Sequence, residues 1–242
     1  MTQLSFDQVM QLLKESQLHY YNFYNNDIKY NIQQTCRWYL TNTNDNITKN
    51  QPIHALYLDI EVYNNNQGMS DHDVDHGTNP INIVTIYDDQ EQIFHTYLLL
   101  FDSNIKSFGI TGPLNDDQWI EFITQRQNYY ISELKNRNYV GNEYIPEIKG
   151  LELHVFFDER LLLQELWKHI HEQDPDILTS WNGDKFDYWY MYNRCVTLFG
   201  EEQVGNILSK FGKVSINNKM VQFCEYSVAD LLYFYRPRDE GG

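Results

Sequence analysis

"IHALYLDIEVY", residues 53 to 63, combines the apolar pattern of a buried β-strand with two acidic residues. Side chains alternate between the two faces of an extended strand, so the apolar residues share one face while Asp59 and Glu61 share the other. Two carboxylates about 7 Å apart along a core strand repel each other unless a positive group lies between or beside them. A divalent cation would satisfy both groups, so this strand predicts a metal site.

An edge strand whose polar face meets water would show the same alternation, because a D-x-E pattern alone is weak evidence for a metal site. Two further features favour the metal site. The apolar residues continue on both sides of the acidic pair, as they do in a central strand, and a second acidic motif follows far downstream.

Length and charge limit the classes of function. The 242 residues suffice for one large domain or two small ones. A formal net charge of -16 argues against a free-standing nucleic-acid binder, since affinity for phosphate normally comes from a surplus of Lys and Arg. Contact with DNA must therefore be local, bridged by metal ions or supplied by another chain.

Cysteine usage and hydropathy predict the compartment. Cys36, Cys195 and Cys224 are widely spaced and form no CxxC pair, which argues against a disulfide framework or a zinc site built on cysteine. The N-terminus lacks the basic and apolar regions of a signal peptide, and no apolar run reaches about 18 residues. We expect a cytoplasmic protein, located in the host cytoplasm if it is viral, with no membrane contact.

Hydrophobic periodicity predicts an α/β sheet covered by helices, because strands are followed by helical segments. Residues 1–52 form a small N-terminal extension with a short helix over 4–16 and an irregular Asn- and Tyr-rich stretch over 19–50. The remaining predicted elements are strands at 53–63, 81–88, 92–101, 151–157 and 176–182, and helices at 115–137, from 158 onward, and from 187 to 200.

A second acidic motif lies in "PDILTSWNGDKFDYWYMYNR", residues 175 to 194. Asp187 falls at a junction between a strand and a helix, where the positive end of the helix dipole favours an ionised carboxylate. An ordinary N-cap aspartate is the commoner role for such a residue. Taken alone, Asp187 therefore does not identify a metal site.

The two motifs together resemble the first two exonuclease motifs of family B DNA polymerases. The first corresponds to "LDIEV" and the second to "WNGDKFD", and the flanking segments "NIVTIYD", "DERLLLQELWKHI" and "YMYNR" resemble the tailed-phage branch of that family. The resemblance covers roughly residues 53–236, whereas residues 1–50 match nothing that we can place. It implies an RNase H-like (ribonuclease H-like) exonuclease domain, with a mixed sheet flanked by helices.

The resemblance also implies a site and a reaction. Asp59, Glu61 and Asp187 would be catalytic ligands of two Mg²⁺ or Mn²⁺ ions, which prefer oxygen ligands. Asn182 would shape the substrate site, and Phe186 would join it in binding substrate. The implied reaction is two-metal hydrolysis that removes single deoxynucleotides from the 3′ end of single-stranded DNA.

The family's third motif, Y-x-x-x-D on a helix, has a match in "YSVAD", which supplies Tyr226 and Asp230. This match follows the second motif closely along the chain. The segment "YSVADLLYFYR" also resembles the strand and helix that precede the true third motif in the family. We prefer this second interpretation and keep Tyr226 and Asp230 as a weaker alternative pair of site residues.

The sequence ends at "RPRDEGG" without any polymerase motif. We therefore expect residues 53–242 to be an exonuclease domain that is incomplete at its C-terminal end and acts with a separate or missing C-terminal polymerase polypeptide during viral DNA replication. Two alternatives stay open: a self-contained exonuclease that uses Tyr226 and Asp230, and a non-catalytic scaffold or interaction module with an incomplete metal site.

Two further groups of polar residues are weaker candidates. "DHDVDHG", residues 71 to 77, gathers acids and histidines but lacks the terminal Glu of a calcium loop, so we expect a solvated connection between strands. His169 and His171 are two positions apart on a predicted helix and do not face each other. We expect both to lie on the surface.

Overall fold

The computed structural model describes residues 53–64, 68–102, 104–136 and 148–232. The chain divides between Pro52 and Ile53 into two compact units, and all described residues belong to the second. The helix expected over 4–16 and the irregular stretch over 19–50 lie outside the described residues.

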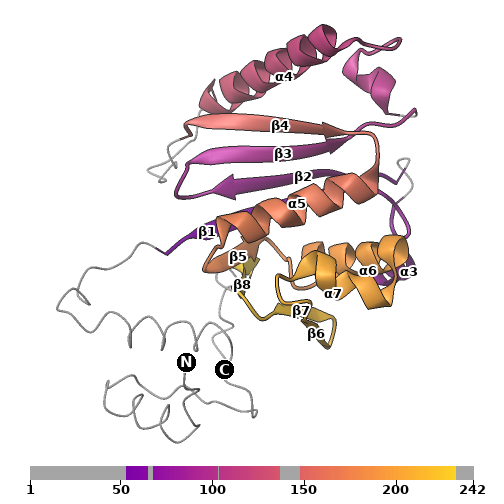
Figure 1. The fold of residues 1–242 in the computed structure, drawn as a ribbon, viewed down its shortest axis with the longest axis vertical. Coiled ribbons are helices and arrows are strands. Elements are labelled where there is room, and N and C mark those ends of the chain that lie inside the picture. Colours follow the sequence, from indigo (N-terminus) through magenta and orange to yellow (C-terminus); the bar gives the residue numbers. More distant parts are fainter. Residues whose placement is uncertain (1–52, 65–67, 103, 137–147, 233–242) are drawn as a thin grey trace, which may run out of the picture. The chain divides into compact units, whose positions relative to one another are not determined.

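Six strands form one mixed sheet (Figure 1). Its order is β4-β3-β2-β1-β5-β8. β2 is antiparallel to both β1 and β3, whereas the pairs β3–β4, β1–β5 and β5–β8 are parallel. The strands are β1 (Ala55–Val62), β2 (Ile81–Asp88), β3 (Ile93–Leu99), β4 (Gly150–Phe156), β5 (Ile177–Ser180) and β8 (Ser227–Asp230).

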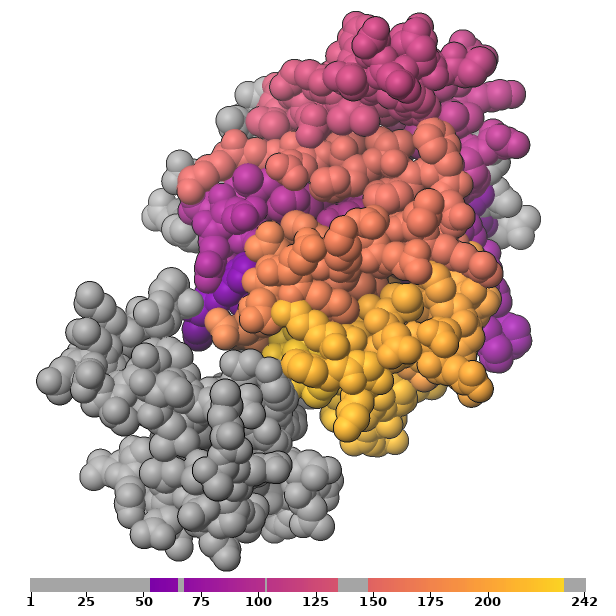
Figure 2. Space-filling model, in the orientation of Figure 1, coloured from indigo at the N-terminus to yellow at the C-terminus, as the bar shows by residue number. Residues whose placement is uncertain are grey.

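Helices flank this sheet, and the predicted mixed α/β class is confirmed. α6 and α7 pack beside α5 (Figures 1 and 2). A separate hairpin pairs β6 with β7. The remaining elements are α3 (Asp71–His76), the 3-10 helix η1 (Ile105–Phe108), α4 (Asp116–Asn136), α5 (Glu159–Gln173), α6 (Asp187–Phe199), α7 (Glu201–Leu208), β6 (Val214–Asn217) and β7 (Met220–Phe223).

β1 is a central strand with the predicted alternation. It pairs with β2 on one side and β5 on the other, so the edge-strand alternative is wrong. Leu56, Leu58 and Ile60 are buried, whereas Asp59 and Glu61 are exposed. The two carboxylates therefore lie on the same face of a strand that the fold holds from both sides.

Strand register assigns residues to the two faces of the sheet. Leu58 lies opposite Ile86, which in turn lies opposite His95. Helix α5 packs against β3 and β4 on the side of the sheet that carries these three residues. We call this side the α5 face. The neighbouring residues point to the other side of the sheet, which we call the acidic face. On this side Asp59 lies opposite Thr85, and Thr85 lies opposite Thr96.

α5 supplies most of the core on its face. Asp158 caps the helix through a hydrogen bond from Arg160 N to its Oδ1, which satisfies one of the free amides of the first turn. Each large apolar side chain that is fully buried contributes about 1.5–3 kcal/mol. Five residues on the inner face of this helix are buried: Leu162, Leu163, Leu166, Trp167 and Ile170.

α4 covers the other end of the sheet on the acidic face. It packs against Leu151 and Leu153 of β4 in a second apolar cluster. Five residues of this helix pack in that cluster: Trp119, Phe122, Ile123, Ile131 and Leu134. Because α4 packs along β4, the acidic pair on β1 lies several strands away from it.

Residues 71–76 connect β1 to β2 without a buried residue, as predicted, but they form helix α3 and not a loop. Ser70 and Asp73 form a reciprocal capping box at its start. Val74 packs against the main core, and Asp75 accepts a hydrogen bond from Trp189 Nε1 at 2.9 Å. The helix ends at Gly77, whose φ of 53° lies in the left-handed region.

The expected surface positions of His169 and His171 are also wrong, because both side chains are half-buried. The ring of His169 lies 4.4 Å from the ring of His95 on β3, centroid to centroid. His171 packs near Trp167, with its Nε2 3.9 Å from a Glu225 oxygen. Contacts from other elements cover both rings.

A buried ion pair joins α5 to α6. Arg194 Nε donates to Glu159 Oε1 at 2.9 Å, and the same oxygen accepts from Ile81 N at 2.8 Å. Arg194 also donates to the carbonyl of Gly77 at 2.9 Å. One charged pair thus ties both helices to β2 and to the end of α3.

Candidate active site

The turn from β5 into α6 has a backbone that only certain residues allow. Asn182 has a φ of 61°, and its carbonyl accepts hydrogen bonds from the amides of Lys185 and Phe186. A Cβ atom at Gly183 would lie 1.6 Å from Ser180 Oγ, so no larger residue fits there without movement. The "WNG" of the second motif is thus a tight turn that leads directly to Asp187.

Asp187 opens α6 and reaches the main chain of β1. Its Oδ1 accepts a hydrogen bond from Ile60 N at 3.3 Å, and the residue is 2% exposed. Burial first, and then the charge of nearby Asp59, raise the pKa of its carboxyl group to about 7. The structure therefore brings an acid of the second motif next to an acid of the first, as two ligands of one cation would require.

Both acids of β1 lie on the surface of the protein. Asp59 stays exposed, yet the protein around its carboxyl group excludes enough water to raise its pKa. Glu61 is exposed one alternation further along the same face. Within the described part of the chain, Asp59, Glu61 and Asp187 do not form a group whose ligand oxygens all lie within 4.8 Å of one another.

The donor set nevertheless fits a hard divalent cation. Carboxylate oxygens are the ligands that Mg²⁺ and Mn²⁺ prefer. Among the described residues, the charges that raise the pKa of Asp187 come from Asp59 first and then from Asp230. A bound ion would supply the missing positive charge.

Asp230 and Tyr226 have partners within the fold. Asp230 ends β8, and its Oδ1 accepts from Asn182 N and Leu232 N, each at 2.9 Å. Tyr226 is 4% exposed and donates to the carbonyl of Leu208 at 3.4 Å. The segment "SVAD" is a strand, whereas the third motif would require a helix. This observation supports our preferred interpretation of that segment as an intervening strand.

The remaining predicted residue, Phe186, is half-buried at the N-cap of α6, with its ring 5.8 Å from that of Tyr190. Two further residues of the motif were not singled out from the sequence. Trp181 is 55% exposed at the same turn. Asp184 is buried, and burial, followed by the charge of Asp230, raises its pKa. Their place inside the "WNGDKFD" motif was the available signal for both.

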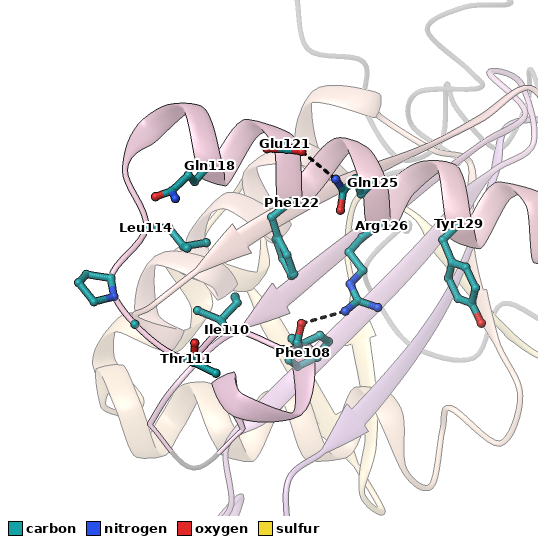
Figure 3. A pocket seen from close by; sticks show the side chains of 13 residues that line it. Phe108, Ile110, Thr111, Leu114, Gln118, Glu121, Phe122, Gln125, Arg126 and Tyr129 are labelled. Carbon is teal, nitrogen blue, oxygen red and sulfur yellow. Dashed lines mark hydrogen bonds between the residues drawn. The ribbon is translucent and has the colours of Figure 1, made fainter.

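A pocket of about 830 Å³ lies elsewhere, between α4 and the segment that follows η1 (Figure 3). Arg126 crosses it to donate to the carbonyl of Phe108 at 2.8 Å. None of Asp59, Glu61 and Asp187 lines this pocket. The acidic residues at the β1 and β5 part of the sheet therefore lie outside this pocket.

The sequence as a whole shows the family to which this chain belongs. A family model described as the exonuclease domain of DNA polymerase family B matches residues 8–232. The chain belongs to this family. The match begins at residue 8, well before residue 53. It therefore includes most of residues 1–52, the N-terminal extension that we could not place from the sequence. Exonuclease domains of this family use divalent metal ions, in agreement with the acids at the site.

Two viral DNA polymerases are similar to parts of the chain. The DNA polymerase of Pyramimonas orientalis virus is 30% identical over 92 residues, which cover 38% of this chain and 8% of that protein. The DNA-directed DNA polymerase of Escherichia phage RB69 is 32% identical over 124 residues, which cover 50% of this chain and 12% of that protein. The match thus spans only a small part of each relative. No described helix has the length and apolar character needed to cross a bilayer.

Proposed function

We propose that this family B exonuclease domain hydrolyses the 3′ ends of single-stranded DNA in the 3′→5′ direction and proofreads for a C-terminal polymerase polypeptide during viral DNA replication. The proposal is carried by one observation: Asp187, buried at the start of α6, lies against β1 beside Asp59. Elements from distant parts of the chain bring two like-charged groups together, which costs free energy unless a cation binds between them.

Asp59, Glu61 and Asp187 would hold two Mg²⁺ or Mn²⁺ ions. When bound, such ions activate water as a nucleophile and stabilise the leaving 3′ oxygen. The ions would also neutralise the acidic face locally and allow a phosphate to approach a chain of net charge -16. The tight turn at Asn182 fixes the position from which Asp187 reaches β1.

Aromatic groups at the same turn would hold the DNA end. Trp181 is exposed there, and Phe186 lies at the N-cap of the same helix as Asp187. Bases of single-stranded DNA stack on such rings regardless of sequence, typically for about 1–3 kcal/mol per base. We assign substrate binding to Phe186 and Asn182, as the resemblance implies, and add Trp181.

The two alternatives have less support. A self-contained exonuclease would need Tyr226 and Asp230 at the reaction centre, but Tyr226 is buried and Asp230 bonds to backbone amides. A scaffold would gain nothing from a buried carboxyl group whose pKa is raised to about 7 by burial and by a second acid. One assay distinguishes both alternatives from the proposed function.

The assay is digestion of a 5′-labelled single-stranded oligonucleotide with Mg²⁺ or Mn²⁺, by the chain alone and together with the polymerase polypeptide from the same genome. We expect a ladder of 3′-shortened products only in the presence of both polypeptides. Asp59→Ala should abolish the ladder, whereas Asp117→Ala, an exposed acid on α4, should not. A ladder from the chain alone would support the self-contained enzyme, and no ladder in either case would support the scaffold.

A further inference from the structure

Three histidines and a glutamate gather on the α5 face of the sheet, which is the face opposite to the acidic pair. His95 on β3 lies directly across from Glu152 on β4, and His154 follows two residues later on the same face. His169 of α5 closes the group, with its ring 4.4 Å from that of His95. We call these four residues the histidine cluster.

The cluster contains buried nitrogens without hydrogen bonds. His95 is 3% exposed, and among the described residues neither its Nδ1 nor its Nε2 has a hydrogen-bond partner. The buried Nε2 atoms of His154 and His169 also lack one. Buried polar groups are nearly always bonded in native proteins, so several such nitrogens at one place indicate a missing ligand.

The ligand atoms converge on one point. Glu152 Oε2 lies 3.4 Å from His95 Nδ1 and 3.8 Å from His154 Nε2. The ligand atoms of these three residues all lie within 4.8 Å of one another. A tetrahedral Zn²⁺ ion binds His nitrogen and carboxylate oxygen at roughly 2.0–2.2 Å, so small side-chain rotations would complete the site.

The surroundings match those of a metal-binding histidine. The other ring nitrogen of His95, Nε2, faces Glu91 Oε2 at 3.6 Å. Histidines that bind metals usually direct their second nitrogen at a carboxylate or carbonyl in this way.

A second group, His54 with Asp88 and Asp89, has a similar composition but no need of a metal. His54 Nε2 bonds Asp88 Oδ2 at 3.0 Å. Asp89 accepts from Ala55 N, and Asp88 accepts from the amides of its own turn. Its polar groups are satisfied by the fold, in contrast to those of His95.

We propose that His95, Glu152 and His154 bind a transition-metal ion, with Zn²⁺ the best fit, at a structural site that joins β3 to β4 beneath His169. Imidazole nitrogen combined with one carboxylate selects Zn²⁺ and its neighbours over Mg²⁺, which prefers oxygen alone. The site lies on the opposite face of the sheet from Asp59 and is independent of the proposed exonuclease chemistry.

The test is calorimetric titration of Zn²⁺ into the chelator-treated chain, with thermal unfolding recorded with and without Zn²⁺. We expect Zn²⁺ binding and a higher Tm in the wild-type chain, and a stoichiometry of one Zn²⁺ ion once the acidic site has been removed. Because Zn²⁺ also binds carboxylates, the titration is repeated in a chain that carries Asp59→Asn and Asp187→Asn. Binding should persist in that background.

Substitution of the proposed zinc ligands should weaken Zn²⁺ binding, whereas substitution of another histidine should not. In the same background, His154→Gln and Glu152→Gln should each weaken Zn²⁺ binding at least tenfold and remove the rise in Tm. Both positions are partly exposed, so the variants should fold, which circular dichroism checks. His76→Gln, an exposed histidine on α3, is the control and should change neither readout. Absent Zn²⁺ binding, unchanged affinity in both ligand variants, or loss of binding in the Asp59→Asn and Asp187→Asn background would each overturn the proposal.

Discussion

Asp187 Oδ1 accepts a hydrogen bond from Ile60 N at 3.3 Å, which joins the start of α6 to the middle of the strand that carries Asp59 and Glu61. The two segments are far apart in the sequence, and the parallel pairing of β1 with β5 helps to bring them together. A carboxylate held between a strand amide and another acid has little freedom to move. Protonation of Asp187 and binding of a metal ion to it can each be measured without an assay of catalysis.

The raised pKa of Asp187 predicts a pH-dependent stability. The group has a pKa of about 7 in the folded chain and 3.8 in the unfolded reference, so protonation contributes stability that is fully present below pH 3.8 and lost as the pH rises through about 7. Asp187→Asn, which keeps an oxygen for the Ile60 amide, should be more stable than wild type by about 2–4 kcal/mol at pH 8 in chelator.

Urea unfolding of both proteins at pH 4, 6 and 8 measures this difference, which should shrink toward zero near pH 4. Asp117→Asn on the exposed face of α4 is the matched control and should show little difference from wild type. A difference between Asp187→Asn and wild type that does not change with pH would contradict the assignment.

Gly183→Ala should distort the turn that positions Asp187. The new Cβ would lie 1.6 Å from Ser180 Oγ and 2.7 Å from Tyr188 Cε2, both in packed surroundings. We expect a loss of about 1–3 kcal/mol in unfolding free energy, together with weaker metal binding. Gly112→Ala, where an added Cβ meets nothing within 4 Å, should have little effect on either measurement.

Arg194→Met should destabilise the chain by about 3–5 kcal/mol, because it leaves buried Glu159 without its charged partner. Adding Glu159→Gln should recover part of that loss. The exposed pair of Lys168 and Glu165 offers the matched comparison, and Lys168→Met should cost less than about 1 kcal/mol. Equal losses at the two pairs, measured by urea unfolding, would show that the buried pair does not hold α5 to α6.

Asp230 should act on the fold rather than on the metal. Asp230→Ala leaves the amides of Asn182 and Leu232 without their acceptor, which should cost about 1–3 kcal/mol. Asp230→Asn keeps one acceptor oxygen and should cost less while leaving Mn²⁺ affinity within threefold of wild type. A tenfold loss of Mn²⁺ affinity in Asp230→Asn would instead restore Asp230 as a metal ligand.

Periodic segments of the fold were predictable from sequence. β1 and α5 follow periods of 2 and 3.6 so closely that their buried residues could be named in advance. α3 was missed because it is short and has only one apolar residue that packs on the core, Val74. Its start was nevertheless encoded in the capping box of Ser70 and Asp73.

The site was predictable only in part. The resemblance selected Asp59, Glu61 and Asp187, but no pattern shows that Asp187 meets the amide of Ile60, because that contact depends on tertiary structure. His169 was expected on the surface for the same reason. Its neighbour His95 comes from another strand, and helix periodicity carries no information about what covers a helix.

We expect Asp59 and Asp187 to bind a divalent metal ion together. Calorimetric titration of Mn²⁺ into the chelator-treated chain at pH 7.5 tests it most directly when repeated on Asp187→Asn, Asp59→Asn and His154→Gln. We predict that His154→Gln binds Mn²⁺ as wild type does, while both aspartate variants bind at least tenfold more weakly. Wild-type affinity in Asp187→Asn would show that Asp187 is not a ligand of the metal ion.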